Sequence, residues 1–210
     1  MPLVTPVLAT PRLRLRPVAL YDARDIQRQF ARFDVVRYMG RAEVPWPFPV
    51  DGATRLLQNR ILPEMKAGLR HSWAITLRGM VDDALIGMVD LTPHNPVENR
   101  QFWLGENWQG HGYMGEAVFA VNDFAFFTLK LAELVMVSAE ANTASVRLKE
   151  RSGAVRFHSG EYEFLEGMLP ASRWRLTRKA WTECRESVWQ HLAARVQGAK
   201  IPDKKQDVGS

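Results

Sequence analysis

Hydrophobic and polar positions along this chain follow two periods in turn, which predicts a mixture of strands and helices. Residues 11–17 alternate leucine with arginine, a pattern typical of a strand with one face in water. On this pattern Arg12, Arg14 and Arg16 form the solvated face. Apolar residues then recur at helical spacing over residues 20–33. Three prolines within residues 45–49 exclude a regular helix there, so the aromatic residues between them pack on the core or line a substrate wall.

The same periodicities place the remaining elements. The run over residues 134–138 is almost continuously apolar, as in a strand buried on both faces. Further strands are predicted over residues 72–77, 84–91, 99–104, 155–158 and 173–178, and helices over residues 51–63, 113–128, 142–153 and 179–196. The pattern indicates a single domain over residues 8–196 followed by a polar tail, residues 197–210, which we expect to be disordered.

The stretch from Phe102 to Ala117 is the most informative part of the chain. It begins apolar and extended, crosses a polar segment containing Gly110, Gly112 and Gly115, and enters a helical pattern. A helix N-terminus has free N–H groups and partial positive charge, and glycines let the backbone approach a phosphate closely. The nucleoside-triphosphate P-loop is excluded because neither Lys-Ser nor Lys-Thr follows. The dinucleotide-binding fingerprint G-x-G-x-x-G also occurs here, but it is disfavoured because its glycines lie at mid-chain. It also requires an acidic residue about 20 residues further on, where only Glu133 is near.

Five segments in order resemble the GNAT acetyltransferases, in particular the branch that acetylates the N-termini of ribosomal proteins. The segment Gln109–Met114 is similar to the family's pyrophosphate loop at its first five positions, and Met114 stands where Gly or Ala is usual. Asn142–Gly153 resembles the second cofactor segment, in which Asn-x-x-Ser leads into a helix that ends at glycine. The other three matches are the opening strand, residues 10–17, the proline-aromatic loop, residues 44–49, and the closing strand, residues 175–181.

This resemblance implies an α/β (α+β) fold with a mixed, mostly antiparallel central sheet of six or seven strands flanked by helices. The strand over residues 99–104 is expected to splay from the strand over residues 134–138 and leave a slot for the cofactor. The implied cosubstrate is acetyl-CoA, and the implied acceptor is a primary amine on a protein N-terminus or a small molecule. The implied cofactor-binding residues are Leu104, Gln109, Gly110, His111, Gly112, Tyr113, Met114, Gly115 and Asn142.

Direct attack on the thioester needs a neutral amine and a group that accepts its proton. Glu106 and Glu140 are the assigned candidates, with Glu98 and His94 also near the expected cleft, although each is better explained as a solvated turn residue. Many family members use a tyrosine beyond the asparagine helix to assist the leaving thiolate. No tyrosine occurs between residues 113 and 162, so Ser145 takes this role by resemblance, or else its hydroxyl bonds the backbone at the helix start.

Composition narrows the remaining function classes. No apolar run reaches the ~18 residues of a membrane helix, the first residues lack a signal-peptide layout, and the single cysteine fits a cytoplasmic protein. The net charge of +5 is spread along the chain, which disfavours nucleic-acid binding. The five histidines lack ligand spacing, so no metal site is expected.

Two further hypotheses accompany the enzyme. A non-catalytic acyl-CoA-binding or regulatory module on the same fold would accommodate Met114 and the absence of an obvious base. A nucleic-acid-binding protein is the third. The identity of the amine and the oligomeric state, including a homodimer, are left open by the sequence.

Overall fold

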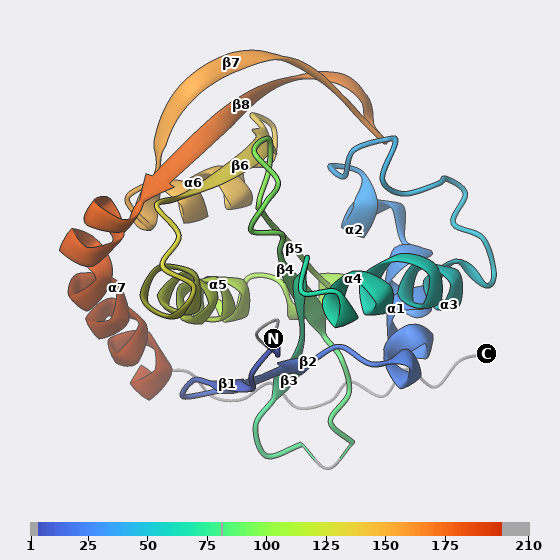
Figure 1. Cartoon of the computed structure of the whole chain (residues 1–210), viewed down its shortest axis with the longest axis horizontal. Helices are drawn as coiled ribbons and strands as arrows, with labels where there is room; N and C mark the ends of the chain where they lie inside the picture. The colour runs from blue at the N-terminus through green and yellow to red at the C-terminus, as the bar shows by residue number, and fades with distance from the viewer. Residues whose placement is uncertain (1–3, 81, 199–210) are drawn as a thin grey trace.

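The computed structural model describes residues 4–80 and 82–198, with side chains through residue 194, and folds eight strands into two sheets (Figure 1). The first sheet has the order β1-β2-β3-β4-β5, and every neighbouring pair in it is antiparallel. Its strands are β1 (Leu8–Ala9), β2 (Leu13–Pro17), β3 (His71–Leu77), β4 (Gly87–Leu91) and β5 (Arg100–Leu104).

The second sheet has the order β6-β8-β7 and is also antiparallel. It contains β6 (Glu133–Ala139), β7 (Val155–Phe164) and β8 (Gly167–Thr177). In Figure 1 the hairpin of β7 and β8 forms a long arch over one end of the molecule. The predicted α/β class is confirmed, but the described residues form eight strands in two sheets where six or seven were expected. The hairpin strands β7 and β8 are also longer than the predicted residues 155–158 and 173–178. Eight of the ten residues of β7 are exposed, including the first seven, so no buried apolar alternation marks its length.

The two sheets meet where β5 begins. The N–H of Asn99 donates to the carbonyl of Val135 at 2.9 Å, and the N–H of Val135 donates to Asn99 Oδ1 at 2.8 Å. The N–H of Val137 donates to Glu98 Oε1 at 3.0 Å. Side chains thus replace the strand ladder here, and among the described residues β5 and β6 are not joined in one sheet. Further along, residues 102–103 of β5 and 137–139 of β6 line a common cavity, so the space predicted between these strands is present.

Helices cover the sheets on two sides. In Figure 1, α1, α3 and α4 lie on one side of β4 and β5, while α5, α6 and α7 lie on the other. Two π-helical turns continue these helices. One, Leu57–Ile61, joins α3 to α4, and the other, Phe124–Thr128, follows α5. The helices are α1 (Ala23–Phe30), α2 (Phe33–Val36), α3 (Gly52–Leu56), α4 (Leu62–Lys66), α5 (Tyr113–Asp123), α6 (Thr143–Arg151) and α7 (Arg178–Gly198), and short 3₁₀ turns occupy Leu20–Asp22 and Glu106–Trp108.

The buried core has a larger part between the first sheet and α5 and a smaller part beneath α1 and α3. Trp181 of α7 is fully buried in the larger part, and its indole N–H donates to Asp123 Oδ1 of α5 at 2.8 Å. This bond satisfies the one polar group of a large apolar ring and fixes α7 against α5. No helix in the described part of the chain is long and apolar enough to cross a membrane.

Candidate active site

The glycine-rich segment forms a tight turn at the start of α5. Gly110 and Gly112 both have φ of +80°, in the left-handed region that favours glycine, and Gly112 is the N-cap of α5. Gly112 provides no side chain to cap the helix, so the first N–H groups of α5 are available to an external acceptor. The local geometry is therefore that of an anion-binding helix start, as the glycine spacing predicted.

A buried carboxylate holds this loop to the beginning of the chain. Glu116 of α5 is fully buried and accepts from Thr10 Oγ1 at 2.5 Å, from the N–H of Arg12 at 2.8 Å and from Arg12 Nε at 2.7 Å. Arg12 Nη1 also donates to the carbonyl of His111 at 3.0 Å. Arg12 therefore clamps the glycine loop and is not a free surface arginine.

Arg16 likewise departs from the predicted solvated face of β2. It is 5% exposed and forms ion pairs with Asp22 and Asp83, at 2.7 Å each. The expectation that Arg12 and Arg16 face solvent was wrong. Their carboxylate partners are distant in sequence or lie in turns, so the alternating pattern of β2 does not reveal them. Arg14, with a half-exposed side chain, matches the expected solvated position.

A groove of about 840 Å³ runs from the glycine loop to α6 and α7. Eight of the nine predicted cofactor-binding residues line it: Leu104, Gln109, Gly110, Gly112, Tyr113, Met114, Gly115 and Asn142. His111 is not among the lining residues, and its ring stacks on Tyr113 with centroids 5.6 Å apart. Gln109 Nε2 donates to the carbonyl of Leu104 at 3.0 Å and links the loop to the end of β5. Arg37, Arg147 and Arg151, which sequence reasoning missed, add positive charge to the groove.

Asn142 and Ser145 lie at the start of α6, next to this groove. The side-chain carbonyl of Asn142 accepts from the N–H of Ser145 at 3.1 Å, so Asn142 is the helix cap. The Ser145 hydroxyl oxygen accepts from Lys149 Nζ at 2.6 Å, one turn further along the helix. Its hydroxyl is thus bonded to a buried lysine, and the backbone contact at the helix start is made by its N–H.

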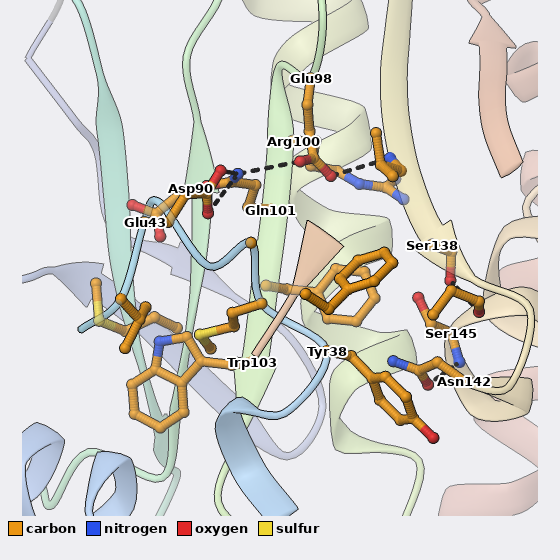
Figure 2. Close-up of a pocket in the computed structure, with 18 of the residues that line it drawn as sticks. Tyr38, Glu43, Asp90, Glu98, Arg100, Gln101, Trp103, Ser138, Asn142 and Ser145 are labelled. Carbon is orange, nitrogen blue, oxygen red and sulfur yellow. Dashed lines mark hydrogen bonds between the residues drawn. The ribbon is translucent and has the colours of Figure 1, made fainter. Parts of the chain in front are cut away.

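A second cavity of about 340 Å³ lies against β5, β6 and the arch of β7. Figure 2 shows Glu98, Arg100, Gln101 and Trp103 coming from the β5 segment, with Ser145 and Asn142 on the other side. The cavity shares six lining residues with the groove, namely Tyr38, Met39, Phe102, Trp103, Asn142 and Ser145. The two compartments therefore meet beside Asn142 and Ser145, two of the site residues predicted from the sequence.

Two carboxylates in the smaller cavity are joined by one amide. Gln101 Nε2 donates to Glu43 Oε1 at 3.0 Å and to Glu98 Oε2 at 3.1 Å, as Figure 2 shows. Neither carboxylate forms an ion pair with another described residue. Burial raises the pKa of Glu98, and the nearby Glu43 carboxylate adds to the increase. The pKa of Glu98 thus lies above that of an ordinary glutamate, as suits a proton acceptor.

Two buried cations lie on the far side of Glu98. Lys149 is 2% exposed and Arg100 is 1% exposed, and both line the smaller cavity. Burial, reinforced by the Arg100 charge, lowers the pKa of Lys149 to about 7. Burial likewise lowers the pKa of Arg100 to about 9. Sequence reasoning missed both residues. Arg100 is a charged residue at an otherwise apolar phase of β5, whereas Lys149 lies one helical turn from the polar Ser145.

The structure separates the predicted base candidates. Glu98 lines the smaller cavity, whereas Glu106, Glu140 and His94 line neither compartment among the described residues. Glu106 is exposed and paired with Arg32. Glu140 is exposed and accepts from Ser172 Oγ at 3.1 Å and from Arg156 Nη1 at 3.2 Å. A base role for Glu106 or Glu140 stays a prediction that this geometry does not favour.

The two sheets separate beside a glycine-rich helix start, and a groove and a cavity meet there. This arrangement is typical of a transferase with a phosphate-bearing cosubstrate. The model of the acetyltransferase (GNAT) domain matches residues 12–155. The chain belongs to this family and is an acetyltransferase, and the family uses acetyl-CoA.

Individual relatives are more distant. The uncharacterized N-acetyltransferase YoaA of Bacillus subtilis (strain 168) is 29% identical over 153 residues, which cover 70% of this chain and 82% of that protein. The ribosomal-protein-S5-alanine acetyltransferase of Vibrio fischeri superposes with a TM-score of 0.68 at 17% identity, covering 84% of this chain and 98% of that chain. Spermidine N-acetyltransferase of Vibrio cholerae, in complex with CoA and spermine, superposes with a TM-score of 0.67 at 17% identity, covering 82% of this chain and 99% of that chain. At these identities the two structures show a shared fold.

Proposed function

We propose that this acetyltransferase moves the acetyl group of acetyl-CoA to a small primary amine by direct attack of the amine on the thioester. The observation that carries the proposal is the junction of the two compartments at Trp103, Asn142 and Ser145. A cosubstrate in the groove and an amine in the smaller cavity would bring their reacting atoms together there. The modest volume of that cavity favours a small molecule or the first residues of a peptide.

The groove supplies the contacts that a CoA molecule needs. The diphosphate would accept hydrogen bonds from the first N–H groups of α5, with Arg37, Arg147 and Arg151 contributing positive charge. The amide-containing arm would lie along the edge of β5 that faces β6, because that edge has no neighbouring strand. A backbone N–H near Leu104 would then stabilise the negative charge that develops on the thioester oxygen.

The carboxylates of the smaller cavity would receive the amine. Glu43 and Glu98 have no cationic partner of their own within ion-pair distance among the described residues, so they would attract the ammonium group. Glu98 would then take its proton, directly or through water, and release the neutral amine for attack. The raised pKa of Glu98 brings its basicity closer to that of the amine.

Ser145 would assist the leaving group. The Lys149 ammonium donates to the Ser145 oxygen, which leaves the hydroxyl hydrogen free to point toward the sulfur. As the C–N bond forms and the C–S bond breaks, the thiolate would take a proton from Ser145, and Lys149 would restore it. CoA thiolate is a moderately good leaving group, so this help is expected at the lower end of the ~10²–10⁴-fold range of acid catalysis.

The test is the kcat of Ser145→Ala in an assay of free CoA thiol over an amine panel. We expect kcat to fall about 10²-fold with little change in acetyl-CoA affinity. Ser152→Ala is the matched control, because Ser152 is a fully buried hydroxyl at the end of the same helix and lines neither compartment. A folded Ser145→Ala protein with wild-type kcat would remove Ser145 from the mechanism. Absence of turnover with every amine would favour a binding module instead.

A further inference from the structure

Three arginines in the described part of the chain are almost fully buried, and two of them are neutralised by carboxylates. Arg16 is paired with Asp22 and Asp83. Arg70 is paired with Glu64 at 2.6 Å and with Asp90 at 3.0 Å. Arg100, at 1% exposure the most buried of the three, has no ion pair with any described residue. A buried charge left without a partner is costly, so this contrast calls for an explanation.

The hydrogen bonds of Arg100 show which part of its guanidinium is unused. Nη1 donates to Asn122 Oδ1 of α5 at 2.5 Å. Nε and Nη2 are buried and have no hydrogen-bond partner among the described residues. These two atoms form the side-on edge of a guanidinium, and their N–H bonds are nearly parallel. That edge matches the two oxygens of a carboxylate, which is the geometry of a bidentate pair.

The charges around Arg100 also favour an anion. Glu98 is the one carboxylate that acts on Arg100, while Lys149 of α6 is a second buried cation in the same cluster. The pKa of Arg100 is lowered because burial outweighs the effect of Glu98. One carboxylate thus faces two buried cations, and a second anion would complete the cluster.

We propose that the free edge of Arg100 binds a carboxylate of the acceptor, so that the acceptor is a small amine that also carries a carboxylate, as an amino acid does. This inference rests on the proposed function and names its substrate class. Arg100 lines the 340 Å³ cavity together with Glu98 and Ser145. In Figure 2 Arg100 and Glu98 lie near one another in the upper part of the view, and Ser145 lies below them. A zwitterion fits this arrangement because the carboxylates of Glu43 and Glu98 hold its ammonium group while Arg100 holds its carboxylate.

The experiment compares amines that differ only at the proposed anionic group. Amino acids are assayed against their own carboxamides, with CoA release as the measurement. The wild-type kcat/KM is expected to favour the free acids by at least about tenfold. Arg100→Met should remove this preference, while Arg60→Met should keep it, because Arg60 lines the same cavity with a half-exposed side chain. Equal rates for acids and carboxamides in the wild type, or a preference lost in Arg60→Met and kept in Arg100→Met, would overturn the proposal.

A binding measurement separates this inference from the proposed function. Free amino acids should raise the melting temperature of the wild-type protein in the presence of CoA, and their carboxamides should raise it less. If no amine is turned over but this difference is found, the proposed function fails and the carboxylate site stands. If carboxamides and decarboxylated amines are turned over as well as acids, the function stands and the site fails. Should Arg100→Met not fold, the comparison within the wild-type protein still decides.

Discussion

Replacing Lys149 with methionine should make the protein more stable at and below neutral pH. The Lys149 side chain is 2% exposed, its one hydrogen-bond partner among the described residues is Ser145 Oγ, and its ammonium lies 5.5 Å from the centroid of the Phe102 ring. Methionine has a similar length and fills the same apolar space without a charge. The substitution therefore removes the cost of a buried ammonium and keeps most of the packing.

The size of the effect follows from the pKa of Lys149, which burial lowers from 10.5 to about 7. Each pKa unit corresponds to about 1.4 kcal/mol, so the whole difference would amount to about 5 kcal/mol. Relaxation and water penetration reduce such costs, and the variant also loses a charged hydrogen bond. We expect a net gain of about 1–3 kcal/mol in the free energy of unfolding at pH 6.

The pH dependence gives the sharper test. Between pH 7 and 10.5 the unfolded chain holds a proton on Lys149 that the folded protein has released, so wild-type stability rises with pH over this window. Lys149→Met lacks this contribution, and its advantage should shrink as the pH approaches 10. Urea unfolding from pH 6 to pH 10 measures both curves.

Lys179→Met is the control, because the Lys179 side chain is 87% exposed and its loss should not change the pH profile. Parallel pH profiles for wild type and Lys149→Met would refute the reasoning. Such a result would mean that Lys149 keeps an ordinary pKa in the folded protein.

Two other predictions concern the groove and the helix beside it. Gly112→Val should abolish the stabilisation of the protein by CoA in thermal melts, because a β-branched side chain would block the phosphate approach. Gly79→Val is the control, because Gly79 has a similar left-handed φ of +85° in a turn that lines neither compartment. The two variants should therefore differ only with CoA present. An unchanged CoA-induced rise in melting temperature in Gly112→Val would refute the loop assignment. Asp123→Ala should lower the free energy of unfolding by about 2–3 kcal/mol, because its carboxylate accepts from Trp181 and from two nitrogens of Arg185. Glu183→Ala, an exposed change on α7 close to Trp181 and Arg185 in sequence, should cost little. Equal unfolding curves for the two variants would contradict this role of Asp123.

The parts of the site that could be predicted from sequence are those encoded locally. The left-handed turns at Gly110 and Gly112 and the cap at Asn142 each depend on residues within a few positions, so their spacing revealed them. The contact of Gln101 with Glu43 spans 58 positions, and that of Thr10 with Glu116 spans 106. No local period encodes such contacts. The buried Lys149 was missed because a lysine on an amphipathic helix is ordinarily in water.

The same limit applies to the fold. The centres of β2, β3, β4 and β5 were predicted from their apolar residues, whereas the two-residue strand β1 was not. Most of β7 is exposed, so hydrophobic periodicity carried no signal for its polar residues 159–163. Its pairing with β8 and the turn at Gly167 define the strand instead.

The clamp of Arg12 and Glu116 on the glycine loop bears on how fast the cosubstrate is captured. Because Arg12 already bonds the carbonyl of His111, the loop would need no rearrangement to accept a diphosphate there. Capture should then be a single bimolecular event, with a rate constant proportional to concentration and free of a slow isomerisation phase. Differences in affinity between CoA derivatives would appear in their residence times, because each derivative would meet the same preformed loop.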